Sequence, residues 1–376
     1  MRLDGFNKKT GLFIIIYHVL LVITWGFYFS FYTPSASMIV ASVILYFMSG
    51  LSITAGYHRY YAHTTYKTVP VVEAILLFFG SMATQASALK WAFEHRLHHA
   101  FVDTDRDPYS VKDGFWYAHI LWLFKKPAPV DNKVVSDLIR NPLVMFQNKY
   151  YIWCMLGSNF LMFLFVGWLL NDYLGAFVLS WWTRLFFLHH STWCINSLAH
   201  YWGERSFSQE QSAVDNYIIS LITFGEGYHN YHHTFANDYR NGIRWYHFDP
   251  TKWLIWGLSR LGLAHGLKQV SSYQIKERLI TTHKQELLEK IQTSITSRQE
   301  ELVAYVNTLS DQMIAKLREA RKLVEEYTSS KQQENNPDRL KALKSEIKTV
   351  KKSLQMDWKR CRQLSRQLLH SEPTMA

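Results

Sequence analysis

Gly225-Glu226-Gly227-Tyr228-His229-Asn230-Tyr231-His232-His233 is the stretch around which the rest of the chain is organised. Its three histidines have the spacing His-x-x-His-His, which places their side chains on one face of a helix. Neutral imidazole is the commonest protein ligand for several transition metals. A single cluster of this kind is also compatible with nothing more than a polar helix face, so the interpretation depends on the rest of the sequence.

Two further histidine clusters precede this stretch. The segment His95-Arg96-Leu97-His98-His99 repeats its spacing, and His58 and His63 form a pair five residues apart. These eight side chains are nearly half of the 17 histidines in the chain. Because the three clusters lie far apart in sequence, they predict one polynuclear metal site that the fold assembles.

The number and type of these side chains limit the metal chemistry. A zinc site usually takes three or four protein ligands, so eight histidines fit two metal ions better than one. The 3 cysteines show no disulfide or thiolate pattern, and we therefore expect nitrogen ligands. A redox-active metal pair beside a membrane would suit O2 activation for attack on a lipidic C–H bond. Composition alone leaves iron, zinc, manganese and copper open.

Four apolar segments are long enough to cross a hydrocarbon core of about 30 Å at about 1.5 Å per residue. Tight turns at 32–35 and 171–173 join them in pairs. The sequence thus predicts an all-α integral membrane protein with four transmembrane helices in two hairpins and a cytosolic helical cap that holds the histidine-rich site. The predicted spans are about Gly11–Phe31, Ala36 to about Tyr57, Asn148–Leu170 and Leu174 to about Asn196.

Charge predicts the orientation of the spans. The loop 57–149 holds eleven Lys and Arg and the two short turns hold none, so the positive-inside rule places this loop, both termini and the active site in the cytoplasm. Val69–Leu89 is also apolar, but if it crossed the membrane the first two histidine clusters would be separated. We therefore expect it at the interface or against the bundle. The net charge of +11 suits anionic membrane lipids or an anionic partner, and no motif indicates nucleic acid.

The C-terminal part of the chain has a different character. A basic helical tail at 271–376 follows a transmembrane domain at 1–270. Apolar residues at heptad spacing predict two helices in an antiparallel, coiled-coil-like hairpin, and a solvated single helix is the alternative. Because the second helix is strongly basic, we expect the tail to dock on an electron donor or on the membrane.

The ordered set of histidine boxes resembles that of the membrane fatty-acid desaturase superfamily. Three short segments resemble those of its stearoyl-CoA (delta-9 acyl-CoA) desaturase branch. They are Ile53-Thr54-Ala55-Gly56, Asn196-Ser197-Leu198-Ala199-His200 and the segment from Gly225 to Phe235. The resemblance covers roughly residues 40 to 265, and we expect a bacterial source, hence the inner membrane.

This resemblance implies two iron ions as cofactor and O2 as cosubstrate. Two electrons would come from a separate donor, such as a ferredoxin or a b-type cytochrome with its reductase. The reaction would place a cis double bond in a saturated acyl chain, without catalytic side chains beyond the metal ligands. The implied ligands are His58, His63, His95, His98, His99, His200, His229, His232 and His233, with Asn196 bound through water.

The resemblance also implies residues around the substrate. Gln85, Trp91 and Thr192 match the side chains that bend the acyl tunnel, and Tyr46 is a candidate for setting its depth. The basic pair Lys125 and Lys126 would meet the phosphates of coenzyme A, while Asp107 and Glu226 would orient ligand imidazoles or cap helices. Two positions, Ala86 and Phe93, lack the polar side chains that contact coenzyme A in the family. An acyl lipid therefore stays open as the substrate in place of acyl-CoA.

Three alternatives remain at this stage. The same histidine boxes serve hydroxylases of alkanes and lipids, although Asn196 and the bend residues favour desaturation. A non-enzymatic, metal-stabilised membrane scaffold is less compatible with so many ligands, because four close a structural site. His189 and His190 in the fourth predicted span are expected as packed, hydrogen-bonded histidines, and a third metal site is the alternative.

Overall fold

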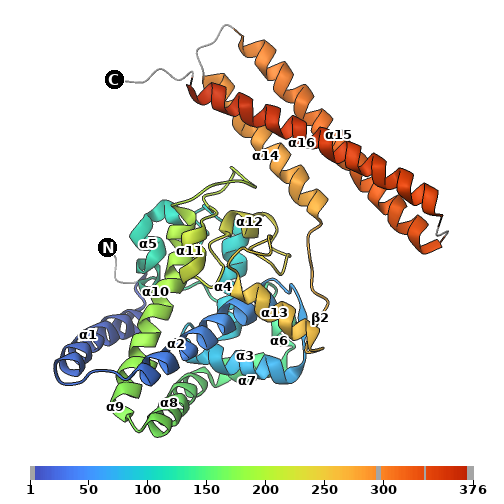
Figure 1. Ribbon diagram of the computed structural model, residues 1–376. Coiled ribbons are helices and arrows are strands. Elements are labelled where there is room, and N and C mark those ends of the chain that lie inside the picture. The colour runs from blue at the N-terminus through green and yellow to red at the C-terminus, as the bar shows by residue number, and fades with distance from the viewer. Residues whose placement is uncertain (1–4, 294–297, 334–335, 371–376) are drawn as a thin grey trace. The chain divides into compact units, whose positions relative to one another are not determined.

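The computed structural model describes residues 5–293, 298–333 and 336–370. These residues are mostly helical (Figure 1), in agreement with the predicted class. The two strands among them, β1 (Lys67–Thr68) and β2 (Ala264–His265), pair antiparallel. The chain divides into two compact units: Met1–Arg205 with Glu210–Gln269, here called the histidine unit, and Ser206–Gln209 with Val270–Ala376, here called the tail unit.

Among the described residues, three helices are long and apolar enough to cross a membrane. Their outward side chains are apolar and widely exposed; Phe31 and Trp153, for example, are 72% and 74% exposed. Such a surface suits lipid far better than water, which identifies an integral membrane protein. The three spans are Lys8–Phe31 (α1), Ala36–Ala62 (α2, Ala36–Leu51, continued by the π-helix η2, Ser52–Ala62) and Tyr151–Leu170 (α8).

The fourth predicted span does not meet the same criterion, so its crossing of the membrane stays a prediction. Its residues are helical but divided into α9 (Tyr173–Gly175), the π-helix η5 (Ala176–Thr183) and α10 (Arg184–Asn196). The charged Arg184 lowers the hydropathy. Its guanidinium is buried and donates hydrogen bonds to the carbonyl oxygen of Met82 (3.0 Å) and to the side-chain oxygen of Asn159. Polar groups at membrane depth are stabilised in this way when they face other helices.

The segment Val69–Leu89 forms the shorter helix α3 (Pro70–Met82). Proline at its first position suits a helix start, because the missing N–H would have no partner there. At about 20 Å the helix is too short to cross the hydrocarbon core.

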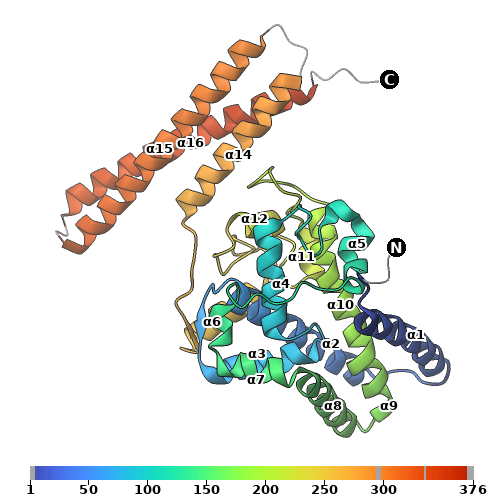
Figure 2. The same cartoon turned by 180° about the vertical axis from the view of Figure 1, so that it is seen from behind.

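Short helices make up most of the rest of the histidine unit, and Figure 2 shows them from the opposite side. Ser87 caps α4 by accepting a hydrogen bond from the backbone N–H of Lys90 (3.3 Å). Asp249 caps α13 in the same way, accepting from Lys252 (2.9 Å). The helices are α4 (Ala88–Phe101), η3 (Val111–Asp113), α5 (Phe115–His119), η4 (Leu121–Phe124), α6 (Ser136–Ile139), α7 (Pro142–Lys149), η6 (Leu198–His200), α11 (Tyr217–Ile222), α12 (His229–Thr234) and α13 (Pro250–Arg260).

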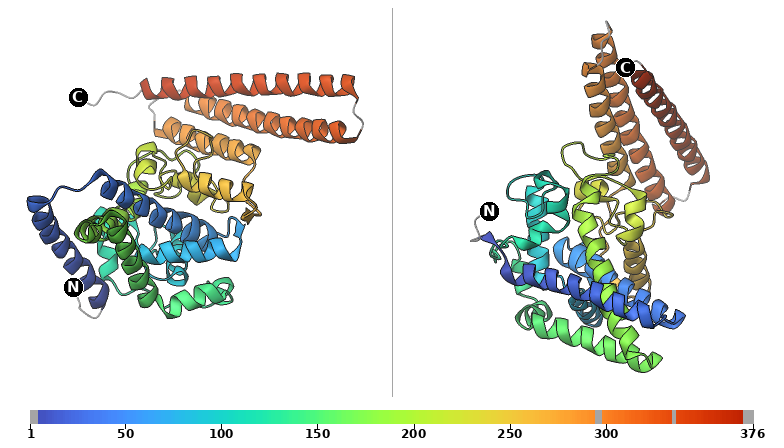
Figure 3. Two further views of the ribbon diagram at one scale, coloured as in Figure 1. Left: turned by 60° about the horizontal axis from the view of Figure 1, so that its bottom comes forward. Right: turned by 90° about the vertical axis from the view of Figure 1, so that its left-hand side faces the viewer.

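The tail unit contains three helices among its described residues, α14 (Ser272–Thr293), α15 (Gln299–Gln333) and α16 (Pro337–His370), which lie side by side in both views of Figure 3. The two helices predicted from the heptad spacing are present as α15 and α16, and the structure adds a third, α14, whose apolar residues pack on α15. Its Leu287 and Ile291 are buried with Met313 of α15 and Leu364 of α16. A supercoiled geometry stays a prediction.

Candidate metal centre

The first two histidines come from a π-helix. His63 directly follows the last residue of η2, and its backbone N–H donates to the carbonyl oxygen of His58 (3.1 Å), the i to i+5 bond that defines this helix type. The two imidazole rings are therefore neighbours, with centroids 4.8 Å apart. In an α-helix, residues five apart would point about 140° away from each other. The His-x4-His spacing thus depends on the π-helical winding.

The remaining histidines come from three elements. Helix α4 carries His95, His98 and His99, the 3₁₀ turn η6 carries His200, and α12 carries His229, His232 and His233. The turn before α12 requires glycine at Gly225, whose φ is +94° and whose added Cβ would lie 2.7 Å from the Cα of Asp249.

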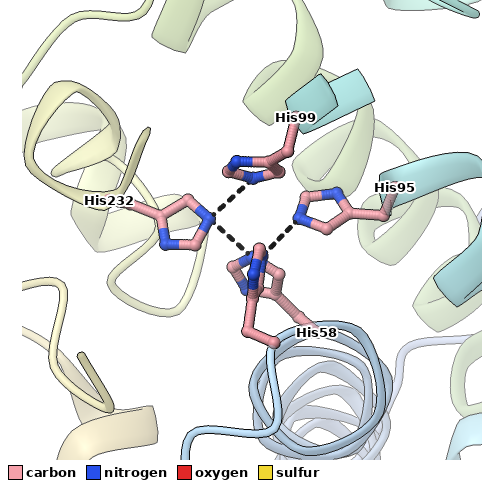
Figure 4. A group of neighbouring side chains, drawn as sticks. His58, His95, His99 and His232 are labelled. Carbon is pink, nitrogen blue, oxygen red and sulfur yellow. Dashed lines mark hydrogen bonds between the residues drawn. The ribbon is translucent and has the colours of Figure 1, made fainter. Parts of the chain in front are cut away.

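The nine predicted histidines meet in two groups. His58, His63, His95, His99 and His232 form the first histidine group; His98, His200, His229 and His233 form the second. Within each group the potential ligand atoms all lie within 4.8 Å of one another. Figure 4 shows His58, His95, His99 and His232 turned toward a common centre.

The spacing between the nitrogens fits a metal ion in each group. The Nε2 atoms of neighbouring histidines are 2.8 Å apart for His63 and His95, 3.0 Å for His58 and His232, and 3.1 Å for His229 and His233. Two nitrogens bound at right angles, about 2.1 Å from one metal, are about 3.0 Å apart. The Nε2 of His200 is buried and has no hydrogen-bond partner among the described residues. A metal ion would satisfy that lone pair.

Burial keeps seven of the nine imidazoles neutral, which is the form that binds metal. Removal from water, followed by repulsion from neighbouring imidazoles, lowers the pKa values of seven of them well below the ordinary histidine value. These seven are His63, His95, His99, His200, His229, His232 and His233.

The second ring nitrogens are held by polar side chains. The Nδ1 of His98 lies 2.8 Å from Asp107 Oδ1, and the Nδ1 of His58 lies 3.0 Å from Glu226 Oε2. These are the two carboxylates that the sequence suggested for this role. The structure adds Ser212, whose Oγ lies 2.8 Å from His200 Nδ1 and which the sequence did not indicate. Such contacts fix the tautomer and the direction of a metal-binding imidazole.

A buried ion-pair network supports the first histidine group. The guanidinium of Arg59, only 1% exposed, lies 3.0 Å from Glu226 Oε1 and 3.0 Å from Asp249 Oδ1. Burial raises the pKa of Glu226, but the charge of Arg59 and the hydrogen bonds from Arg59 and the His58 ring outweigh it, and the net pKa is below the ordinary value. Glu226 is therefore ionised. The sequence analysis missed Arg59 and Asp249; the position of Arg59 directly after a ligand was the available signal.

A cavity of about 970 Å³ reaches from the histidine groups to the outside of the unit. His58, His95, His98 and His229 line it, as does Asn196. The predicted bend residues line it too, and the amide of Gln85 donates to Thr192 Oγ1 (2.9 Å) while Trp91 stacks on His95 with centroids 5.0 Å apart. The two histidine groups and the residues expected to bend the acyl chain therefore border one cavity.

Comparison with known proteins identifies the family. Residues 33–265 match the protein family described as "Fatty acid desaturase". The chain belongs to this family. It is 42% identical to the "Probable acyl-CoA desaturase" of Schizosaccharomyces pombe over 267 residues, a stretch that covers 69% of this chain and 55% of the relative.

Other relatives carry similar names. The chain is 39% identical to "Acyl-CoA desaturase 1" of Saccharomyces cerevisiae over 273 residues (72% of this chain, 54% of the relative) and 36% identical to "Stearoyl-CoA desaturase 5" of Bos taurus over 248 residues (63% and 73%). The chain spans about half the length of the two yeast relatives. Because these two are fungal, the expected bacterial source is not supported.

The remaining residues that were expected to contact the substrate of this desaturase-family chain lie in two places. Lys125 and Lys126 line the cavity, and their segment is held by the N-terminus, since the N–H of Lys126 donates to the carbonyl of Gly5 (2.8 Å). Tyr46 is missing from the described residues that line the cavity. Its hydroxyl lies 2.8 Å from Ser191 Oγ, so the structure does not place it against the substrate space.

The two additional histidines of α10 make hydrogen bonds in separate directions. The Nδ1 of His189 lies 3.1 Å from the hydroxyl of Tyr17. His190 uses one nitrogen toward His119 (3.1 Å) and the other toward His18 (3.3 Å). Because these contacts form a chain without a common centre, they support packed histidines. The described residues contain no metal-binding group other than the two above.

Proposed function

We propose that the chain is an O2-dependent fatty acyl desaturase that introduces a cis double bond, at the delta-9 position, into a saturated acyl-CoA. The observation that carries this proposal is the single cavity bordered by both histidine groups and by the Gln85–Thr192 pair. Its relatives named as acyl-CoA and stearoyl-CoA desaturases support the substrate class. The donor of the two electrons is proposed to be a separate ferredoxin or b-type cytochrome.

Two iron ions, one held by each histidine group, would supply the O2 chemistry that removes two hydrogens from adjacent CH2 groups. The chain's own residues hold this arrangement rigid. Glu226 and Asp107 accept hydrogen bonds from ligand imidazoles and fix their tautomers. Asn196 lines the cavity and is proposed to reach one metal through water. Burial of both groups excludes bulk water from the reacting carbons.

The substrate would enter with its headgroup at Lys125 and Lys126 and its chain bent past Trp91 and Thr192. Trp91 stacks on His95, so a side chain proposed to bend the acyl chain is in direct contact with a proposed metal ligand. Misplacement of the acyl chain by about 1 Å would separate the target carbons from the metals. The side chains of Trp91 and Thr192 are therefore proposed to determine which bond reacts.

An acyl lipid is the second candidate substrate. Phe93, where the family has a polar contact to coenzyme A, is buried in the core and does not line the cavity. A relative that is 34% identical is an "sn-2 palmitoyl-lipid 9-desaturase" of Nostoc. Turnover of stearoyl-CoA by the purified chain, inhibited by free coenzyme A, would support the acyl-CoA proposal; turnover of phospholipid alone would replace it.

Gas chromatography of fatty acids from a host that expresses the chain tests the reaction. A new monounsaturated acid is expected, and a product with an added oxygen would indicate a hydroxylase. His232→Ala should abolish the product and lower the iron content, whereas His265→Ala, a change at an exposed histidine outside both groups, should do neither. Bound metal without any product would favour a structural scaffold.

The arrangement in the membrane is part of the proposal. We propose four spans, a catalytic domain at 1–270, a tail domain at 271–376, and cytoplasmic termini and active site. Both histidine clusters that flank α3 contribute to one group, which supports their lying on the same side of the membrane. Cysteine labelling at Lys67→Cys and Lys90→Cys should report the cytoplasmic side for both positions. Labels on opposite sides would refute this topology.

A further inference from the structure

The positive charge of the tail unit is concentrated on one helix. Helix α16 contains ten Lys and Arg against three Asp and Glu. Helix α14 contains four against three, and α15 five against six, so each is nearly neutral. A partner that binds the tail unit through charge would therefore meet α16.

Most of these basic side chains have no acidic neighbour. Two of the ten are paired, Arg339 with Glu326 and Arg360 with Asp357 (3.4 Å). The other eight are exposed and have no ion-pair partner among the described residues. They are Lys341, Lys344, Lys348, Lys351, Lys352, Lys359, Arg362 and Arg366.

The eight residues share one flank of the helix, here called the basic flank. Leu343, Leu354, Cys361 and Leu364 mark the buried seam of α16. When this seam takes the a and d positions of a heptad, all eight unpaired basic residues fall at b, e and f. The opposite flank, at c and g, carries the two paired arginines and the acidic Glu346. The charge is thus one-sided along the whole helix.

The length of the basic flank indicates the kind of partner. From Lys341 to Arg366 it extends about 38 Å along a straight helix. A transient electron-transfer interface buries less than about 600 Å² on each partner, a patch roughly 28 Å across. One small electron carrier would thus leave part of the row uncovered, while a flat bilayer can contact all of it. The buried apolar residues of α16 are used in the seam, and the exposed Met356 falls at c, on the opposite flank. The contact would therefore rest on charge, without insertion.

A short segment connects helix α14 of the tail unit to the histidine unit, which carries the spans. The N–H of Lys268 donates to the carbonyl of Thr65 (2.8 Å), and its own carbonyl accepts from Tyr239 (2.9 Å). Helix α14 begins at Ser272, so only three residues, at most about 10 Å long, separate it from Lys268. The segment Ser206–Gln209 joins the two units a second time, so the tail unit cannot diffuse away from the chain that carries the spans.

We propose that the basic flank of α16 is a binding surface for anionic phospholipid headgroups and holds the tail unit against the membrane that contains the spans. The proposal requires the membrane attachment of the chain but not its desaturase activity. Evidence against the desaturase activity would therefore leave the lipid-binding proposal unaffected, and evidence against lipid binding would leave the desaturase proposal unaffected.

Lysine footprinting of the full chain in lipid nanodiscs tests this surface. The chain is acetylated in discs of phosphatidylcholine alone and of phosphatidylcholine with phosphatidylglycerol, and labelled lysines are identified by mass spectrometry. Lys344, Lys348 and Lys352 should be protected in the anionic discs only, and added salt should remove the protection. Lys276, Lys322 and Lys331, exposed lysines of α14 and α15, are internal controls and should label equally in both discs.

A pair of matched variants separates the basic flank from total charge. In one variant, Lys344, Lys348 and Lys352 are replaced by glutamine. The ratio of membrane-bound to unbound tail units should then fall roughly a hundredfold, at about fivefold per lysine. The remaining lysines Lys341 and Lys359 should therefore be acetylated in anionic discs as readily as in neutral ones. Replacing the three control lysines by glutamine should leave these two positions protected.

Equal labelling of the basic flank in neutral and anionic discs would overturn the proposal, as would equal protection of the control lysines. Protection by a soluble acidic electron carrier in neutral discs, with none from anionic lipid, would assign the flank to a protein partner instead.

Discussion

Replacing Asp107 by asparagine tests how the second histidine group is held. The buried carboxylate of Asp107 faces three donors: the Nδ1 of His98 at 2.8 Å, the N–H of Tyr109 at 3.2 Å and the N–H of Asp103 at 3.1 Å. Asparagine has the same shape, but its NH2 must point at one of these donors. Either Asp103 loses its acceptor, or His98 is forced to the other tautomer, which places a proton on its metal-binding nitrogen.

The size of the effect follows from this geometry. A buried donor without an acceptor costs about 1–3 kcal/mol. Loss of a partner that orients a ligand imidazole typically weakens metal binding about 10–100-fold, or about 1.4–2.7 kcal/mol. The two figures agree, so Asp107→Asn should bind the metal of the second histidine group about 10–100-fold more weakly and leave the first group loaded.

Iron content measured against a graded series of competing chelator checks this prediction. The variant should fall from two irons to one at a chelator concentration that leaves the wild type full. Asp113→Asn, a change at an exposed carboxylate of η3, is the matched control and should follow the wild type. If Asp107→Asn keeps both irons as tightly as the wild type, this carboxylate does not position His98 for metal.

Three further predictions concern packing, the substrate and the buried charges. Gly50→Ala should destabilise the fold by about 1–3 kcal/mol in a detergent melting experiment, because its Cβ would lie 2.1 Å from the ring of Phe224; an unchanged melting temperature would contradict this contact. Thr192→Val removes the acceptor of the Gln85 amide and should change the double-bond position, seen by gas chromatography, while iron stays bound; loss of iron would assign Thr192 to the metal support. Arg59→Met leaves two buried carboxylates without their cation and should cost about 3–5 kcal/mol in denaturant unfolding; a smaller cost would mean that water reaches the network.

The histidine spacing allowed the nine candidate ligands to be predicted, but not their division between two groups. The adjacent pair His98 and His99 contributes one residue to each group, and so does the pair His232 and His233. Neighbours on a helix differ by about 100° in direction, so two metals that flank a helix each receive one member of a pair. Which member goes to which group depends on how α4 and α12 are rotated in the fold, and that rotation is set by tertiary packing.

The residues that the sequence analysis missed support the site indirectly. Ser212 and Asp249 lie in irregular segments, and neither has a spacing that relates it to a histidine. Their contacts arise only when distant parts of the chain meet. Likewise, the apolar positions of α14 are fewer than those of α15, so the sequence reasoning recognised a repeat only from Leu302 onward and did not predict a third helix.

The π-helical winding of η2 restricts the second span in a way that its composition does not reveal. A bilayer tolerates a span that is one residue, or about 1.5 Å, shorter, since tilt and local thinning absorb the difference. Deleting one residue between His58 and His63 would let η2 wind as an ordinary helix, in which residues four apart lie about 40° from each other, so the two histidines would stay together. Winding η2 as an ordinary helix with its length unchanged would instead point His63 about 140° away from His58. The span would still cross in both cases, but the second change would remove His63 from the first histidine group. In this stretch the winding of the backbone is as essential as the chemistry of the side chains, so engineered insertions and deletions belong in the turns, such as 171–172.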